Sequence, residues 1–366
     1  MTTHPSATRL ARLPRPLGLE SGADLPGVQV AYRTWGRLDR DRSNAVLVCH
    51  ALTGSADVDQ WWPDLLGPGR ALDPARDFIV CSNVLGSCYG TTGPRSPRPG
   101  GGGAWGPDFP AITIRDIVRA QAALLDALGV GRLRLVVGGS LGGMQALEWG
   151  VLYPGRMDAI APIATSARHS AWCIGLSEAQ RQAIAADPQW CGGRYPEDAP
   201  PRAGLAAARM VAMCAYRSPA SFGLRFGRHR EDDGRFAVES YLQHQGRKLV
   251  DRFDANAYVT LTRAMDSHDV GRGRDGWRTA LAGVRARALV VSIESDVLYV
   301  PAEQRDLAAA IPGARLATIA SPHGHDGFLI EGAAVNDLLL EFRHEVEAGA
   351  RTTAPCASSR DGAWAS

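Results

Sequence analysis

Residues 133–149 (LRLVVGGSLGGMQALEW) constrain the fold of this chain more than any other segment. They begin with an apolar run typical of a buried strand, continue through glycines around Ser140, and end in a helical pattern. A strand that becomes a helix at G-x-S-x-G turns sharply, so the residues beside the serine must be small. Such a turn would hold the Ser140 hydroxyl above the end of a sheet, next to the first amides of the helix.

The motif alone carries limited information, because 41 of the 366 residues are glycine and a chance match is easily found. A glycine-rich turn between a strand and a helix could also be purely structural, or could bind phosphate. The strand before the turn and the helix after it favour a nucleophilic serine. Such a serine needs a general base, and the base needs a group that orients it.

Short apolar runs alternate with helical patterns on both sides of the serine, which is typical of a parallel sheet covered by helices on both faces. The predicted strands are residues 28–35, 45–49, 78–81, 133–137, 157–164, 288–293 and 314–319. The predicted helices of the same part are residues 113–128, 144–153, 302–310 and 333–347. From about residue 165 to 283 the strand signal is weak, and helical patterns such as 204–216 and 238–250 replace it.

The pattern therefore predicts one sheet domain interrupted by a mostly helical insertion. We assign residues 1–165 and 286–348 to the α/β core and residues 166–285 to a helical cap, or lid. We expect the proline-rich first residues to be loose. We also expect the small, polar tail at 349–366 to be disordered.

Composition and charge exclude several classes of function. The net charge is +2 and 21% of the residues are charged, so nothing indicates a nucleic-acid partner. No apolar run approaches the ~18 residues of a membrane helix, and the N-terminus lacks the apolar stretch of a secretory signal. The seven cysteines are widely spaced and odd in number, without C-x-x-C. This pattern argues against a disulfide framework or a zinc site and favours a reducing cytoplasm, so we expect no metal.

The partners of Ser140 are expected in the order acid, then histidine, each in a loop that follows a strand. Asp296 follows the sixth predicted strand and His325 follows the seventh, so order and placement both fit. Glu294 and His323 lie two residues away from these candidates. The residues alone leave both alternatives open.

Two backbone amides are candidates for an oxyanion hole, the pair of donors that stabilises the negative oxygen formed during acyl transfer. One is Leu141, directly after the nucleophile, and the other is Leu52, in the loop that follows strand 45–49. We interpret His50, which opens that loop, as a loop or core residue. These features predict an α/β-hydrolase-fold enzyme that works through an acyl-serine. They do not choose between water and an amino-acid hydroxyl as acceptor.

The segment GGSLGGMQALEW at 138–149 resembles the homoserine O-acyltransferases, acetyl-CoA-dependent enzymes of methionine synthesis with the α/β-hydrolase fold. The likeness covers about residues 12–345 and includes the sequence around the predicted base. Its other segments are AYRTWGRL (31–38), NAVLVCHALTG (44–54), WWPDLLGPGRALD (61–73), NVLGSCYGTTGP (83–94), YRSPASFGLRFGR (216–228), VESYLQHQGRKLVDRFDANAY (238–258), LTRAMDSHDVGRGR (261–274) and GHDGFL (324–329).

The resemblance implies roles for individual side chains. Ser140, Asp296 and His325 match the family's catalytic triad, which also selects between the two neighbouring histidines. Arg209 would bind the carboxylate of the acceptor, and Asp326 would bind its ammonium group. From its position alone, Arg209 would be placed on the outer face of a cap helix.

The implied reaction moves an acetyl group from acetyl-CoA to the hydroxyl of L-homoserine through an acyl-serine. The resemblance also implies a cytoplasmic homodimer joined through cap helices, with no permanently bound cofactor. The alternatives within the family are succinyl-CoA as donor or serine as acceptor. A serine esterase comes next, and a non-catalytic binding protein of the same fold comes last.

Overall fold

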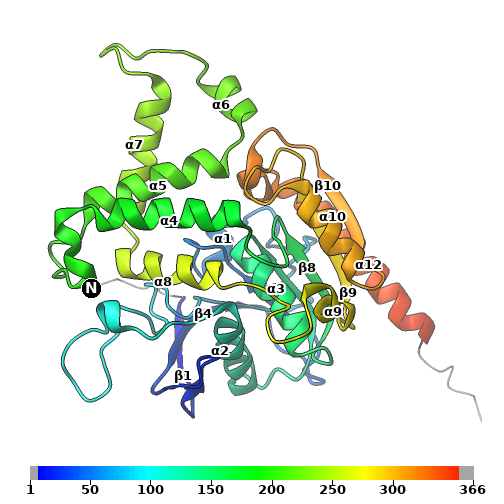
Figure 1. Cartoon of the computed structure of the whole chain (residues 1–366). Helices are drawn as coiled ribbons and strands as arrows, with labels where there is room; N and C mark the ends of the chain where they lie inside the picture. The colour runs from blue at the N-terminus through cyan, green and yellow to red at the C-terminus, as the bar shows by residue number, and fades with distance from the viewer. Residues whose placement is uncertain (1–6, 354–366) are drawn as a thin grey trace, which may run out of the picture.

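A computed structural model of the chain describes residues 7–353 (Figure 1). Its main sheet has the strand order β1-β4-β6-β5-β7-β8-β9-β10. The pairs β1–β4 and β4–β6 are antiparallel, and all other neighbours in this sheet are parallel. The sheet is therefore mostly parallel, as the sequence predicts.

The strands of this sheet are β1 (Arg9–Arg12), β4 (Gln29–Trp35), β5 (Ala45–Cys49), β6 (Phe78–Ser82), β7 (Leu133–Gly139), β8 (Met157–Ile163), β9 (Arg287–Ile293) and β10 (Arg315–Ile319). A separate pair is formed by β2 (Leu17–Gly18) and β3 (Asp24–Leu25). The helices of the sheet domain are α1 (Val58–Trp61), α2 (Ile114–Ala127), α3 (Leu141–Leu152), α10 (Pro301–Ala310), α11 (Gly327–Ile330) and α12 (Gly332–Thr353), with 3-10 turns η1 (Gly106–Asp108) and η3 (Gly324–Asp326).

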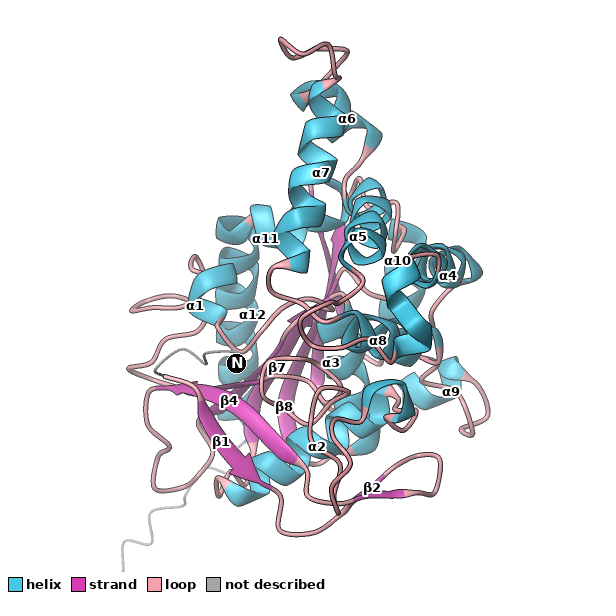
Figure 2. Cartoon of the chain, turned by 90° about the vertical axis from the view of Figure 1, so that its left-hand side faces the viewer, coloured by secondary structure: helices cyan, strands magenta, loops and turns pink. Residues whose placement is uncertain are grey.

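Strand β5 is buried on both faces because its side chains alternate between two hydrophobic cores. Leu47 belongs to a core with residues of α2 and α3, whereas Val46 and Val48 belong to a second core with residues of α1 and α12. Figure 2 shows these two helical layers on opposite sides of the sheet. A strand covered on both faces needs apolar side chains at every position, which explains the uninterrupted run AVLVC.

The chain between β8 and β9 is helical. It contains α4 (Ala171–Ala185), η2 (Pro188–Gly193), α5 (Arg202–Tyr216), α6 (Pro219–Arg225), α7 (Ala237–Val250), α8 (Ala255–Asp266) and α9 (Trp277–Ala282). Both views show α6 and α7 projecting from the body of the molecule, beyond α4 and α5 (Figures 1 and 2). That residues 166–285 act as a cap over the site stays a prediction at this stage.

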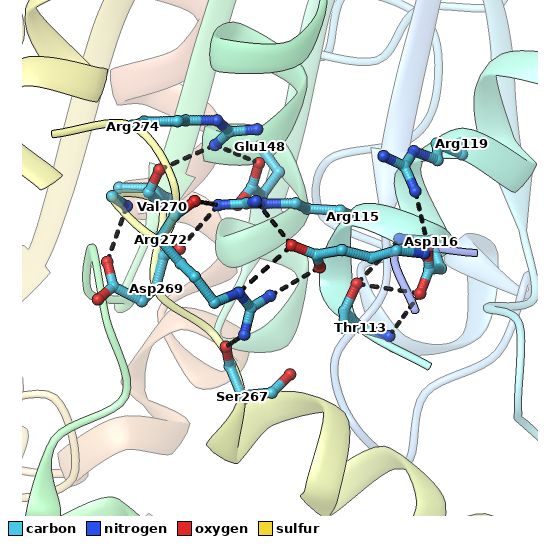
Figure 3. A network of polar contacts seen from close by, with 12 residues as sticks. Thr113, Arg115, Asp116, Arg119, Glu148, Ser267, Asp269, Val270, Arg272 and Arg274 are labelled. Carbon is cyan, nitrogen blue, oxygen red and sulfur yellow. Dashed lines mark hydrogen bonds and ion pairs between the residues drawn. The ribbon is translucent and has the colours of Figure 1, made fainter. Parts of the chain in front are cut away.

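A buried polar network attaches the chain that follows α8 to the sheet domain (Figure 3). Glu148 of α3 is 1% exposed and accepts hydrogen bonds from Arg115 of α2 at 3.1 Å and from Arg274 at 2.9 Å. Arg115 also donates to the carbonyl oxygens of Asp269 and Arg272. Burial raises the pKa of Glu148, and the two guanidinium groups oppose that shift. The network therefore holds the end of the insertion against α3, the helix that begins directly after Ser140.

The structure bears on the expectations for both chain ends. The first residues are not all loose, because β1 pairs with β4 from Arg9 to Arg12. No local sequence pattern marks β1, because its strand conformation depends on pairing with β4, which follows later in the chain. At the other end, α12 continues to Thr353 and so includes the first residues of the expected tail, while residues 354–366 lie outside the described part. Within residues 7–353, no helix combines the length and apolarity needed to cross a membrane.

Candidate active site

Ser140 occupies a sharp turn between β7 and α3. Its backbone has φ 59° and ψ −124°, a conformation that L-residues rarely adopt and that costs of order 1–3 kcal/mol. The flanking glycines of the motif are required by packing. A β-carbon on Gly138 or Gly142 would lie 2.5 Å or 2.1 Å from the carbonyl oxygen of Cys49. The turn is thus pressed against the end of β5.

Asp296 and His325 are joined by a hydrogen bond. His325 donates from Nδ1 to Asp296 Oδ2 at 2.8 Å, and each residue is 3% exposed. A carboxylate only accepts hydrogen bonds, so the ring proton lies on Nδ1 and Nε2 is left as the basic nitrogen. The other oxygen of Asp296 accepts the amides of Leu298 at 2.8 Å and Tyr299 at 3.0 Å, which fixes the carboxylate.

The two neighbouring alternatives lie elsewhere. Glu294 is exposed. The Nδ1 atom of His323 lies 3.3 Å from the hydroxyl of Ser221 at the start of α6. Among the described residues, neither side chain is paired with the Asp296–His325 unit.

Phe328 of α11 connects the serine turn to the histidine. A β-carbon on Gly139 would lie 2.4 Å from the Phe328 ring, so the glycine before Ser140 makes room for that ring. The centroids of the Phe328 and His325 rings are 5.4 Å apart. The Phe328 ring therefore contacts both the residue before Ser140 and the His325 ring.

The loop after β5 is fixed by His50. Its Nε2 accepts the amide of Val84 at 3.0 Å, and its Nδ1 donates to the carbonyl of Ala51 at 2.8 Å. Burial lowers the pKa of His50 to about 4, so the ring is neutral. This arrangement matches our interpretation of His50 as a loop or core residue.

Leu52 and Leu141 are both buried residues, and neither backbone amide donates a hydrogen bond to another part of the described chain. Gln145 of α3 connects the segments that carry them, because its Nε2 donates to the carbonyls of His50 at 3.2 Å and Leu141 at 3.0 Å. Buried amides without partners are uncommon, and they suit a site that receives a negatively charged oxygen.

Arg209 and Asp326 both lie close to His325. The Arg209 guanidinium lies 5.2 Å from the centroid of the Tyr216 ring, and that ring lies 5.8 Å from the His325 ring. Asp326 directly follows His325 in η3, and its Oδ2 lies 3.1 Å from Nε of Arg217. No local sequence pattern marks Tyr216 and Arg217 as site residues, because Tyr216 ends α5, Arg217 follows it, and both are far along the chain from the loop they contact.

The charges of Arg217 and Arg209 also act on Asp326. Burial raises the pKa of Asp326, and the positive charges of Arg217 and Arg209 oppose that shift. Arg209 and Asp326 carry charges complementary to the carboxylate and the ammonium group of an amino acid. Among the described residues, no cluster of three His, Cys, Asp or Glu side chains is arranged to hold a metal ion.

A second carboxyl group lies near Asp296. Burial, followed by the negative charge of Asp296, raises the pKa of Glu303 of α10 to about 7. Glu303 lines a cavity of about 410 Å³ together with Arg168 and Asp306. The sequence shows Glu303 only as a charged residue at a helix start, so only the fold reveals this environment.

The fold and the site define a class of protein. Residues 44–331 match a family model described as the alpha/beta hydrolase fold. A mostly parallel sheet, a strained serine turn after a central strand, and a His–Asp pair in later loops is the arrangement of that class.

A curated relative shows the family, and two solved structures share the fold. A curated homoserine O-acetyltransferase of Trichormus variabilis is 60% identical over 340 residues, covering 93% of this chain and 94% of the relative. A solved homoserine O-acetyltransferase from Bacillus anthracis has a TM-score of 0.84 at 26% identity, covering 92% of this chain and 97% of that chain. A solved esterase called E22 has a TM-score of 0.85 at 26% identity, covering 92% and 99%. The chain belongs to the homoserine O-acetyltransferase family, and the esterase shows that overall shape alone does not separate the two activities.

Proposed function

We propose that this chain transfers an acetyl group from acetyl-CoA to the hydroxyl of L-homoserine, a step of methionine biosynthesis. The observation that carries the proposal is the 60% identity with a homoserine O-acetyltransferase over 93% of the chain. The charges beside His325 support it. Arg209 suits the carboxylate of an amino acid, and Asp326 suits its ammonium group.

In the first half-reaction, His325 accepts the proton of Ser140 on Nε2, because Nδ1 is held by Asp296. The serine oxygen attacks the thioester carbonyl of acetyl-CoA. The amides of Leu52 and Leu141 donate to the oxygen that becomes negative, and each such donor contributes roughly 3 kcal/mol in other enzymes. The C–S bond then breaks, the proton passes from His325 to the thiolate, and CoA leaves an acetyl-serine behind.

In the second half-reaction, homoserine enters the site vacated by CoA. Arg209 binds its carboxylate and Asp326 binds its ammonium group, which directs the side-chain hydroxyl toward His325. His325 removes the hydroxyl proton, and the oxygen attacks the acetyl carbon. The bond to Ser140 breaks, and the serine recovers its proton from His325. Because the first product leaves before the acceptor binds, ping-pong kinetics follow.

The helical segment 166–285 acts in this scheme as a cap that limits water. Water would hydrolyse the acetyl-serine and waste the donor. Support comes from α5, whose Arg209 and Tyr216 lie beside the base. A second contact is formed at Gly324, where a β-carbon would lie 2.6 Å from the backbone of Arg217.

The proposed assembly is a cytoplasmic homodimer joined through the cap. We infer that a second copy of the chain packs against the projecting part of the cap, where Leu224 of α6 is 79% exposed. The six described cysteines are free, which is compatible with a reducing compartment. Sedimentation of the wild type and of Leu224→Glu tests the dimer, and a wild-type monomer would contradict it.

The alternatives differ in donor or acceptor. Succinyl-CoA would bring an additional carboxylate. Arg217, the extra cation beside Asp326, is already paired, which favours the acetyl donor.

Steady-state rates with acetyl-CoA or succinyl-CoA, each with homoserine or serine, test both choices. We expect the acetyl-CoA and homoserine pair to be fastest, with parallel double-reciprocal lines. Intersecting double-reciprocal lines would contradict the acyl-enzyme. Fast ester hydrolysis whose rate does not depend on homoserine would indicate an esterase.

A further inference from the structure

The pairing of Arg217 with Asp326 has no role in the reaction scheme given above, although it lies inside the candidate site. The two side chains are mostly buried, with 16% and 17% of their surfaces exposed. Nε of Arg217 lies 3.1 Å from Oδ2 of Asp326. Among the described residues, no other side chain forms an ion pair or hydrogen bond with this carboxylate.

The backbone holds this pair in place. Arg217 is the C-cap of α5, and Ser218 is the N-cap of α6. A β-carbon on Gly324 would lie 2.6 Å from the carbonyl carbon of Arg217 and 2.6 Å from the nitrogen of Ser218. The Ser218 hydroxyl also donates to the carbonyl of Pro322. The joint between α5 and α6 is therefore packed directly on the loop that carries His325 and Asp326.

The charges around Asp326 define what the pair can do. The groups that act on it are Arg217 directly after α5, the neighbouring His325, Arg209 of α5, and Asp296 from the loop after β9. Burial favours the neutral acid, and Arg217 is the largest of the charges that favour the carboxylate. An ammonium group binds strongly to a carboxylate and only weakly to a neutral carboxyl group.

We propose that Arg217 is a positioning residue for amino-acid recognition, which sets its positive charge against one oxygen of Asp326 so that the carboxylate receives the ammonium group of the acceptor. This inference rests on the proposed function, because it takes an amino acid as the acceptor. Arg217 itself does not touch the reacting atoms. It acts through Asp326, so its effect falls on binding of the acceptor and depends on pH.

The test uses the full-length protein with Arg217→Met, Arg217→Lys and, as a matched control, Arg305→Met. Arg305 is exposed on α10 and has no ion pair with another described residue. Homoserine KM and kcat are measured for each protein from pH 6 to 8.5. Without Arg217, Asp326 binds a proton more readily. We expect the KM of Arg217→Met, relative to wild type, to rise about tenfold at pH 6 and much less at pH 8.5.

The variants separate this role from a merely structural one. Arg217→Lys should recover part of the KM, because it keeps the charge, and Arg305→Met should match wild type at every pH. A KM increase that is the same at all pH values would overturn the proposal, since Arg217 would then contact the substrate directly. An unchanged KM at pH 6 would also overturn it.

Two further readouts keep this result distinct from failure of the proposed function. A p-nitrophenyl acetate burst reports acetylation of Ser140 without an acceptor. If Arg217→Met loses the burst, Arg217 acts on the triad or on folding, and the proposal is wrong. If homoserine does not discharge the wild-type acetyl-enzyme, the proposed function fails instead. NMR titration of the Asp326 carboxyl carbon tests the effect of Arg217 on this carboxylate directly. An Asp326 pKa that is the same with and without Arg217 would overturn the pairing role.

Discussion

The carbonyl oxygen of Cys49 lies only 2.1 Å from the position that a β-carbon of Gly142 would occupy. This contact joins the end of β5 to the first turn of α3, the elements that lead to Leu52 and Leu141. The same oxygen faces Gly138 on the other side of the serine turn. The separation of the two candidate oxyanion amides therefore depends on two positions that tolerate no side chain.

Gly142→Ala should disrupt this contact, because the obstructing atom is backbone and cannot rotate away. We expect the p-nitrophenyl acetate burst to slow by about 100-fold or more, since one oxyanion donor is displaced. We also expect a loss of about 1–3 kcal/mol in the free energy of unfolding, measured by urea titration. Gly155→Ala is the matched control, because its β-carbon would meet no atom within 4 Å. A normal burst in Gly142→Ala would refute this account of the turn.

Replacing Ser140 separates chemistry from backbone strain. Ser140→Ala and Ser140→Gly should both abolish the burst, because neither offers a nucleophile. Glycine adopts a φ of 59° without the penalty of a β-carbon, so Ser140→Gly should be more stable than Ser140→Ala by about 1 kcal/mol. Thermal unfolding of the two variants at one pH measures the difference. Equal stabilities would mean that the turn stores no strain at this residue.

His50 should contribute to acid denaturation. Its pKa is lowered to about 4 in the folded protein, while an unfolded histidine has a pKa near 6.5. Between these values the unfolded chain binds more protons, so stability falls as the pH drops from about 6.5 to 4, by up to about 3 kcal/mol for this group.

A urea titration series across that pH range, comparing wild type with His50→Gln, measures the contribution of His50. The variant should lose part of the pH dependence. The remainder should persist, because burial also lowers the pKa of His268, to about 3. An unchanged slope in His50→Gln would show that His50 is not a buried neutral group.

Glu303 should affect stability in the opposite direction. Its pKa is raised to about 7, so between about pH 4.5 and 7 the folded chain keeps a proton that the unfolded chain has released. Stability therefore falls as the pH rises through this range. Glu303→Gln should be more stable than wild type at pH 8 by about 1–2 kcal/mol, after allowance for solvent screening, and similar to it near pH 4.5. Asp198→Asn, at an exposed loop position, is the control. A difference that does not vary with pH would refute this assignment.

Several elements could be predicted from the sequence because their causes are local. The run AVLVC at β5 is apolar at every position, as a strand covered on both faces requires, and its predicted bounds match the structure. The order of serine, acid and histidine follows from the order of strands in a parallel sheet, which places successive loops at one edge. The resemblance then selected His325, whose Nδ1 donates to Asp296 in the structure.

The sequence by itself determined the mostly parallel sheet, the serine turn and the loops that hold its candidate partners, because periodicity and small residues act between near neighbours. Only the tertiary structure decided that Arg217 pairs with Asp326 and that Glu303 lies near Asp296. It also decided that β1 joins the sheet edge. These contacts join segments that are distant in the chain. Their strength depends on burial and on distances of a few ångströms, which no local pattern of residues encodes.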